Sequence, residues 1–193
     1  MRRPVFLTGM MGSGKSTVGR LLAAEAEAEF VDLDVRIERL FGQRIADMLG
    51  GANADPAKFR ARERLALTTL LDEPGFAQRR VVVATGGGVV LDAHNRRQMR
   101  QVGTVVYLRV AVEVLASRLS ADIAEDPQAR PLLPPAVVDL RARLLELSSA
   151  RTADYDDCDL TVDGAGPAQM VASRILAALR EATVSGEREH EAV

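Results

Sequence analysis

The sequence predicts an α/β fold, in which a five-stranded parallel sheet lies between two layers of helices. Two observations lead to this prediction. Short apolar runs alternate along the chain with longer amphipathic stretches, which is the pattern of a parallel sheet covered by helices. The runs at 81–85 and 104–108 are also almost wholly apolar, as is typical of strands that are buried on both faces.

Each element follows from its local pattern. Strands are expected at 5–8, 30–33, 81–85, 104–108 and 160–162. Helices are expected at 15–28, 35–40, 45–49, 56–71, 92–100, 112–120, 136–152 and 167–183. Ligands of such sheets bind beyond the carboxyl ends of the strands, so the chemistry is expected just after Leu7, Leu33, Thr85 and Leu108.

Length and composition limit the classes of protein that fit. The 193 residues suit a single domain, expected over 1–184 with a lid at about 119–134 and a disordered polar tail at 185–193. The net charge of −2 and the lack of a long apolar run predict no nucleic-acid partner and no membrane partner. Cys158 is the single cysteine, so no internal disulfide can form, and a reducing, cytoplasmic location is expected.

The most informative motif lies between the first strand and the first helix. Residues 9–16 read Gly-Met-Met-Gly-Ser-Gly-Lys-Ser, which fits the phosphate-binding pattern G-x-x-x-x-G-K-[ST]. Its glycines let backbone N–H groups surround phosphate oxygens at the start of a helix. Lys15 is expected to bridge the β- and γ-phosphates of a nucleotide, and Ser16 to offer its hydroxyl to Mg²⁺.

Two carboxylates follow the second strand. Asp32 and Asp34 are two residues apart, so in an extended chain both can point to the same side. One can hold Mg²⁺ through water, and the other can accept the proton of an acceptor hydroxyl. Asp34 also precedes a predicted helix, so a role as its N-cap is an open alternative.

Three further segments are candidates for an acceptor site. Arg60 and Glu63 are three residues apart on a predicted helix, where the arginine could hold a carboxylate, although a solvated charged face is an alternative. The three glycines at 86–88 let the backbone lie against a ligand. Arg130 lies in the proline-rich segment 121–134, which is either a lid over the phosphates or a surface loop.

Taken in order, these segments resemble the shikimate kinase family, from about Val5 to about Val162. The phosphate-binding loop is common to many families, whereas the ordered set of the others is specific. The resemblance rests on residues 9–17, Asp32 and Asp34 with Ile37 and Glu38, Phe59 and Arg60 with Glu63, Gly86–Gly88, Arg130 to Leu133, and Arg151 with Tyr155.

The resemblance implies a P-loop kinase fold and MgATP-dependent phosphorylation of the 3-hydroxyl of shikimate by a monomer, in the route to chorismate and aromatic amino acids. By analogy, Asp34, Lys15 and Arg130 are catalytic, and Ser16 and Asp32 (through water) hold Mg²⁺. The residues expected to bind ATP are Gly12, Ser13, Gly14, Lys15, Ser16, Thr17, Arg118 and Arg130. The residues expected to bind shikimate are Asp34, Arg60, Gly86, Gly87, Gly88 and Arg151.

The sequence departs from the family pattern near the end of the site. The family usually has a proline between the counterparts of Arg151 and Tyr155, whereas this chain reads Arg-Thr-Ala-Asp-Tyr. Asp154 is therefore expected to put a negative charge near an anion site, which bears on acceptor affinity. Alternatives are a kinase for aminoshikimate or gluconate, and a nucleotide-binding regulatory protein without turnover.

Overall fold

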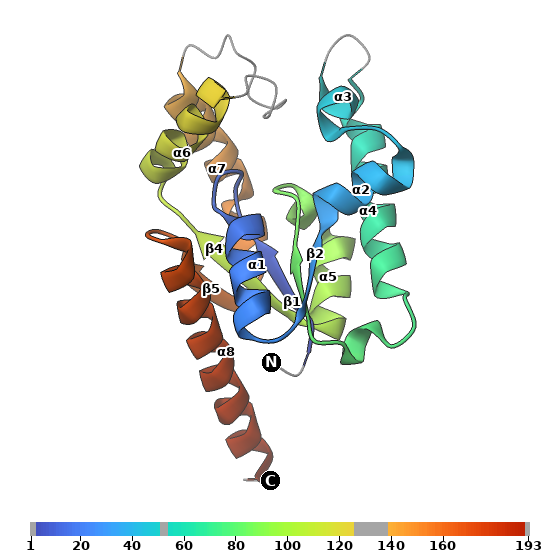
Figure 1. Cartoon of the computed structure of the whole chain (residues 1–193), viewed down its shortest axis with the longest axis vertical. Helices are drawn as coiled ribbons and strands as arrows, with labels where there is room; N and C mark the ends of the chain where they lie inside the picture. The colour runs from blue at the N-terminus through green and yellow to red at the C-terminus, as the bar shows by residue number, and fades with distance from the viewer. Residues whose placement is uncertain (1–2, 51–53, 126–138, 192–193) are drawn as a thin grey trace.

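The protein folds around one twisted sheet with helices on both faces (Figure 1). The computed structural model describes residues 3–50, 54–125 and 139–191. The strands are β1 (Val5–Thr8), β2 (Glu29–Asp32), β3 (Val81–Ala84), β4 (Thr104–Arg109) and β5 (Leu160–Asp163). They pair in the order β2-β3-β1-β4-β5, and every pairing is parallel. The predicted five-stranded parallel sheet is therefore confirmed.

The helices alternate with these strands. They are α1 (Lys15–Glu25), α2 (Leu33–Phe41), α3 (Ile45–Leu49), α4 (Pro56–Leu71), α5 (Ala93–Val102), α6 (Val112–Glu125), α7 (Leu140–Asp156) and α8 (Ala168–Glu191). Two short 3₁₀ helices, η1 (Phe76–Gln78) and η2 (Val89–Leu91), flank β3. In the described ranges no helix combines the length and the apolar character needed to cross a membrane.

Alternate residues of the strands enter different cores. Val5 and Leu7 pack with α1 and α8 on one face of the sheet. Phe6, between them, packs with α2, α3, α4 and α5 on the other face. Because successive strand side chains point to opposite faces, a strand covered on both sides must be apolar throughout. This explains why β1 and β3 are buried at every position.

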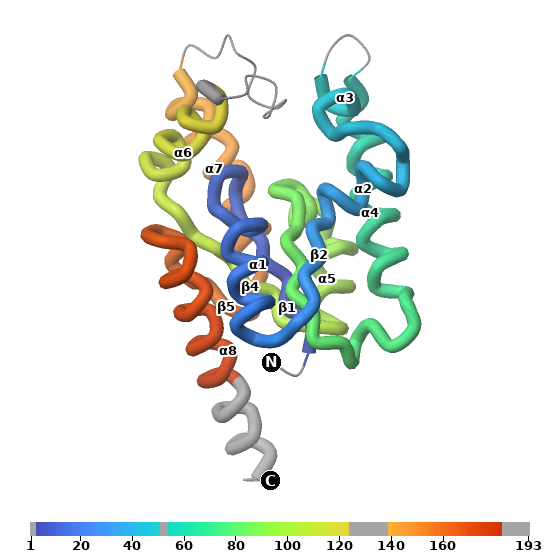
Figure 2. The backbone as a smooth tube through the Cα atoms, viewed as in Figure 1, coloured from blue at the N-terminus to red at the C-terminus, as the bar shows by residue number. Residues whose placement is uncertain are grey.

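A third apolar cluster lies beside the phosphate-binding loop. It joins Met10 to Leu115 and Leu119 of α6 and to Leu144 and Tyr155 of α7. Figures 1 and 2 show α6 and α7 on one side of the loop that follows β1, and α2 and α3 on the other. The cluster therefore anchors a helix pair next to the carboxyl ends of the strands.

Several boundaries differ from the predicted ones. α2 begins at Leu33, and its N-cap is Asp32, whose carboxylate accepts a hydrogen bond from the Asp34 amide at 3.1 Å. Asp34 therefore lies in the first turn of a helix, so the predicted extended chain through both aspartates is wrong. A side chain that satisfies a free N–H at this point starts the helix two residues earlier.

The helices α6 and α8 extend past their predicted ends. α6 runs to Glu125, so the first part of the predicted lid at 119–134 is helical, while residues 126–138 lie outside the described residues. α8 runs to Glu191, past its predicted end at Thr183. In both segments glutamate and other good helix formers continue the helix where polarity alone suggested a loop.

Candidate active site

The phosphate-binding loop has the backbone shape that its glycines predict. Gly12 and Gly14 have φ of 77° and 91°, values that residues with a Cβ adopt only under strain. Gly14 is the N-cap of α1, so the free N–H groups of the first helical turn face the loop. The loop and the helix terminus together provide the donors that bind phosphate oxygens.

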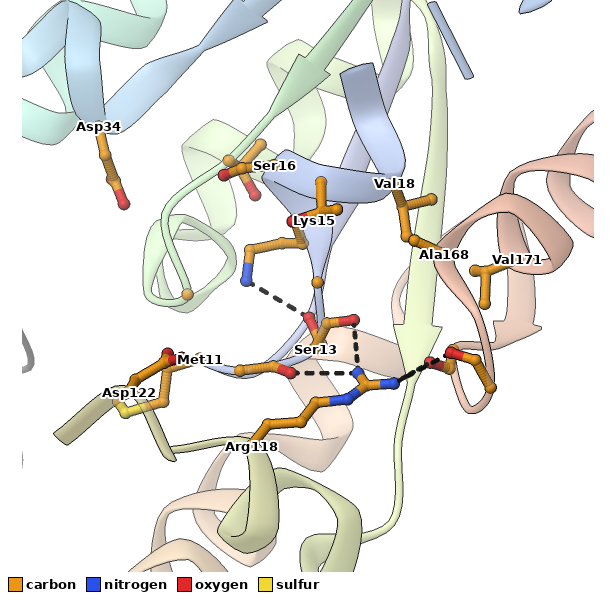
Figure 3. A pocket seen from close by; sticks show the side chains of 17 residues that line it. Met11, Ser13, Lys15, Ser16, Val18, Asp34, Arg118, Asp122, Ala168 and Val171 are labelled. Atoms are coloured by element: carbon orange, nitrogen blue, oxygen red, sulfur yellow. Dashed lines mark hydrogen bonds between the residues drawn. The ribbon is translucent and has the colours of Figure 1, made fainter. Parts of the chain in front are cut away.

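Lys15 folds over this loop. Its Nζ donates to the carbonyl oxygens of Gly9 and Met10, at 2.9 Å each. The side chain borders a cavity of about 500 Å³ lined by residues 11–18, by Asp34 and by Arg118. Figure 3 shows Asp34 on the far side of this cavity from Arg118. A nucleotide phosphate in the cavity would meet an ammonium group already held beside the loop.

Arg118 connects the phosphate-binding loop to the segment that follows the edge strand β5. One guanidinium nitrogen donates to the carbonyl of Gly12 at 3.2 Å, and another donates to the carbonyl of Gly164 at 3.2 Å (Figure 3). Gly164 follows β5, so the arginine joins two strand ends that are far apart in the sequence. The predicted ATP-binding residue thus lies on the wall of the cavity.

The cavity has lining residues that sequence reasoning missed. They are Thr85, Asp122, Gly164, Gly166, Ala168 and Val171. Thr85, Gly164 and Gly166 follow the ends of strands, which is the signal that could have identified them. Asp122 belongs to the part of α6 that was predicted to be a loop, so no helical position could be assigned to it.

A buried ion pair lies on the acceptor side of the cavity. Glu63 of α4 is almost fully buried and pairs with Arg60 one turn earlier. Burial raises the pKa of the Glu63 carboxyl, Arg60 opposes that rise, and the charge of Asp34 adds to it. Its second oxygen, Oε1, is buried without a hydrogen-bond partner in the described structure. The alternative of a solvated charged face is therefore wrong for Glu63. Its Oε1 atom could accept a hydrogen bond from a further donor.

Two of the three consecutive glycines, Gly86 and Gly88, make room for these charged groups. A Cβ on Gly86 would come within 2.7 Å of an Asp34 carboxylate oxygen and 2.8 Å of Glu63 Oε1. A Cβ on Gly88 would overlap the Arg60 guanidinium. Neither glycine has a positive φ, so their requirement is space rather than backbone conformation. The glycine run was predicted to let the backbone lie against a ligand, and in the structure Gly86 and Gly88 let protein side chains approach the backbone.

Arg151 completes this side of the site from α7. Its charge acts on both Glu63 and Tyr155, so its guanidinium lies near both groups. Tyr155, one turn later, donates from its hydroxyl to the carbonyl of Gly87 at 2.5 Å and stacks on Tyr107 with ring centroids 5.0 Å apart. Burial raises the pKa of Tyr155 to about 12. The tyrosine joins α7 to the triple-glycine loop.

The predicted site residues thus fall into three groups. The P-loop residues, Arg118, Asp34 and Gly87 line the cavity. Arg60, Gly86, Gly88 and Arg151 cluster at its acceptor side around Glu63. Asp32 caps α2 and lines a neighbouring groove, whereas Arg130 lies outside the described residues.

The oxygen donors of the cavity fit a magnesium ion bound with a nucleotide. Ser16 and Asp34 both line it, and a hydroxyl and a carboxylate are donors that Mg²⁺ accepts. No group of three or more His, Cys, Asp or Glu side chains in the described part of the chain could hold a metal by itself. Mg²⁺ that is bound with a nucleotide commonly takes one or two carboxylates together with substrate phosphates and water.

Comparison with known proteins decides the family. The family model described as shikimate kinase matches residues 11–180. The chain belongs to the shikimate kinase family. The shikimate kinase of Bordetella pertussis is 43% identical over 161 residues, which are 83% of this chain and 70% of that protein. The shikimate kinase of Gloeobacter violaceus is 41% identical over 175 residues, 91% of each chain.

Solved structures give the same family. The shikimate kinase of Acinetobacter baumannii in complex with shikimate matches with a TM-score of 0.80 and 33% identity over 94% of each chain. A gluconokinase from Sinorhizobium meliloti has a TM-score of 0.58 at 19% identity and shares only the fold. Members of the shikimate kinase family are phosphotransferases that use ATP, so the predicted enzyme class is confirmed.

Proposed function

We propose that this chain transfers the γ-phosphoryl group of ATP to the 3-hydroxyl of shikimate, giving shikimate 3-phosphate and ADP. The observation that supports this acceptor is the cluster of Arg60, Arg151 and Asp34 beside the phosphate-binding loop. Two guanidinium groups suit a carboxylate, and a carboxylate suits a hydroxyl that must lose a proton. Shikimate carries both a carboxylate and hydroxyl groups.

On the nucleotide side, the loop amides and Lys15 hold the phosphates. Lys15 exchanges its contacts with the carbonyls of Gly9 and Met10 for phosphate oxygens and stabilises the charge that develops during transfer. Ser16 would hold Mg²⁺ in the cavity, and Asp32, which lines the neighbouring groove, would reach the ion only through water. The ion, when bound, neutralises charge on the phosphate oxygens. Arg118 would lie at the adenine end of the nucleotide, and the predicted role of Arg130, which lies outside the described residues, is to supply a further cation to the phosphates.

On the acceptor side, Arg60 and Arg151 bind the shikimate carboxylate and fix the ring. Glu63 holds the Arg60 guanidinium in place through its buried pair. Asp34 accepts the proton of the 3-hydroxyl as its oxygen attacks the γ-phosphorus, and the bond to the bridging oxygen of ADP breaks. The loop at 86–88 leaves space for these groups.

Both substrate sites lie on one chain, which supports a single-domain enzyme that acts as a monomer over residues 1–184. The single cysteine supports a reducing, cytoplasmic location. No nucleic-acid partner is proposed, because the net charge is −2 and Arg118 faces a small cavity.

A coupled ADP-release assay with MgATP tests the proposal. Shikimate, aminoshikimate, gluconate and no acceptor are compared at equal concentration. Turnover with shikimate that far exceeds the others is expected. Equal turnover with gluconate would contradict the role of the arginine pair. ATP binding without turnover on any acceptor would leave a nucleotide-binding protein, as the regulatory alternative predicts.

A further inference from the structure

A partly buried arginine outside the cavity joins three segments next to the acceptor site. Arg96 of α5 has a side chain that is 15% exposed. Its guanidinium donates to Asp154 Oδ1 at 2.8 Å, to Asp157 Oδ2 at 2.7 Å and to the carbonyl oxygen of Val90. A buried guanidinium with charged partners on two sides holds those partners in fixed positions.

Two partners of Arg96, Val90 and Asp154, lie next to the acceptor clamp, which is the proposed pair of Arg60 and Arg151. Val90 belongs to η2, two residues after Gly88, whose backbone lies against the Arg60 guanidinium. Asp154 lies three residues after Arg151 and directly before Tyr155 on α7. Arg96 therefore connects the loop that positions one clamp arginine to the helix turn that carries the other.

The same contact accounts for the charge of Asp154. The sequence predicted that this carboxylate would weaken an anion site, because it is close to Arg151. Residues three apart on a helix are neighbours, so an unpaired Asp154 could attract the Arg151 guanidinium away from an acceptor. In the structure Asp154 pairs with Arg96 instead. Its charge is thus neutralised from outside the clamp.

We propose that Arg96 is a positioning residue for the acceptor carboxylate. It holds the last turn of α7 against η2 and keeps Asp154 away from Arg151, so that Arg60 and Arg151 face the same group. The proposal rests on the proposed role of Arg60 and Arg151.

The experiment compares Arg96→Gln with Arg100→Gln in full-length protein. Arg100 lies on the same helix and pairs with Asp157 and Asp159, but its side chain is 45% exposed, and in the described part of the chain it forms no ion pair with Asp154 and no hydrogen bond with Val90. Arg96→Gln is expected to raise the KM for shikimate roughly 10-fold, the scale of one lost charge-assisted contact. The kcat and the KM for ATP should stay within about 3-fold, and Arg100→Gln should change all three by less than about 2-fold.

A double variant separates charge from packing. Arg96→Gln with Asp154→Asn removes both members of the pair, so the carboxylate of Asp154 no longer competes for Arg151. The KM for shikimate of the double variant should be lower than that of Arg96→Gln and closer to the wild-type value, even if its melting temperature stays as low as that of Arg96→Gln. Assays are run well below both melting temperatures, so that a loss of folded protein does not enter the constants.

Each result decides the proposal. The proposal would be overturned by an unchanged KM for shikimate in Arg96→Gln, or by an equal rise in Arg100→Gln. It would also be overturned if Arg96→Gln impaired kcat, the KM for shikimate and the KM for ATP to the same extent. Arg60→Ala is measured alongside. If Arg60→Ala raises the KM and Arg96→Gln does not, only the positioning role fails. If neither does, the proposed clamp itself fails.

Discussion

The two sides of the active-site cavity are built in opposite ways. The proposed nucleotide side comes mainly from one continuous segment, residues 9–17. The groups that this segment offers to a phosphate are mostly backbone N–H groups. The acceptor side comes from α2, α4, the loop before η2 and α7, and its groups are charged side chains. The first side is local in the sequence, and the second exists only when four separate segments meet.

Glycine serves a different purpose on each side. Gly12 and Gly14 are needed for their positive φ, which shapes the phosphate loop. Gly86 and Gly88 have no positive φ and are needed because carboxylates and a guanidinium occupy the place of a Cβ. A glycine in a ligand site can therefore serve the backbone or the neighbouring side chains, and only the packing distinguishes the two.

The largest effect is expected on the nucleotide side. Lys15→Met removes the ammonium group beside the loop and with it the stabilisation of transferred charge. We expect kcat to fall by about 10³-fold, the upper end for loss of one electrostatic group. Steady-state kinetics measure this, and calorimetry of nucleotide binding with a circular dichroism spectrum verifies the fold. Near-normal turnover would contradict the role of Lys15.

The second largest effect is expected at Asp34, which lines the cavity between the nucleotide side and the acceptor side. Asp34→Asn keeps the size of the side chain but removes its basicity. We expect kcat to fall by about 10²-fold while the KM for shikimate changes much less, because general bases contribute on this scale. Rapid-quench measurement of the transfer step separates chemistry from product release. Full retention of kcat would mean that Asp34 neither orients nor deprotonates the acceptor.

The acceptor side can be tested through its glycines. Gly88→Ala should displace the Arg60 guanidinium and raise the KM for shikimate by roughly 10- to 100-fold, as expected for loss of a charge-assisted contact. The matched control is Gly87→Ala, because the nearest atom to its Cβ would be 3.4 Å away. A similar rise in both variants would show that the loop binds substrate through its backbone rather than making room for Arg60.

The smallest effect concerns Tyr155, which joins α7 to the glycine loop. At neutral pH, Tyr155→Phe should lower the free energy of unfolding by about 1 kcal/mol, the usual value of one hydrogen bond. The pKa of Tyr155 is raised to about 12, above that of an unfolded tyrosine, so the unfolded state loses its proton first as the pH rises. Stability that depends on this group is therefore present below pH about 10 and is lost between about pH 10 and 12.

Denaturant unfolding of both proteins from pH 7 to 11.5 measures this difference. The advantage of the wild type over Tyr155→Phe should shrink above about pH 10, because the variant has no phenol to titrate. A constant difference across that range would show that the hydroxyl is not buried in solution.

Some features could be predicted because they depend on neighbours in the sequence. The alternation of apolar runs predicted all five strands, and the loop at 9–16 predicted the phosphate cradle, since its spacing and its flanking strand and helix are local properties. Helix ends were less predictable. The start of α2 depends on one capping carboxylate, that of Asp32, and α6 continues to Glu125 through residues whose polarity predicted a loop.

What the sequence by itself determined is therefore the sheet, the nucleotide cradle and, by resemblance, the family. Only the tertiary structure decided that Glu63 is buried with Arg60, that Gly86 and Gly88 make room for charged groups, and that Arg96 neutralises Asp154 across two helices. The physical reason is distance along the chain. Backbone conformation is set by residues a few positions apart, whereas the burial and pairing of a charge depend on which distant segments the fold brings together.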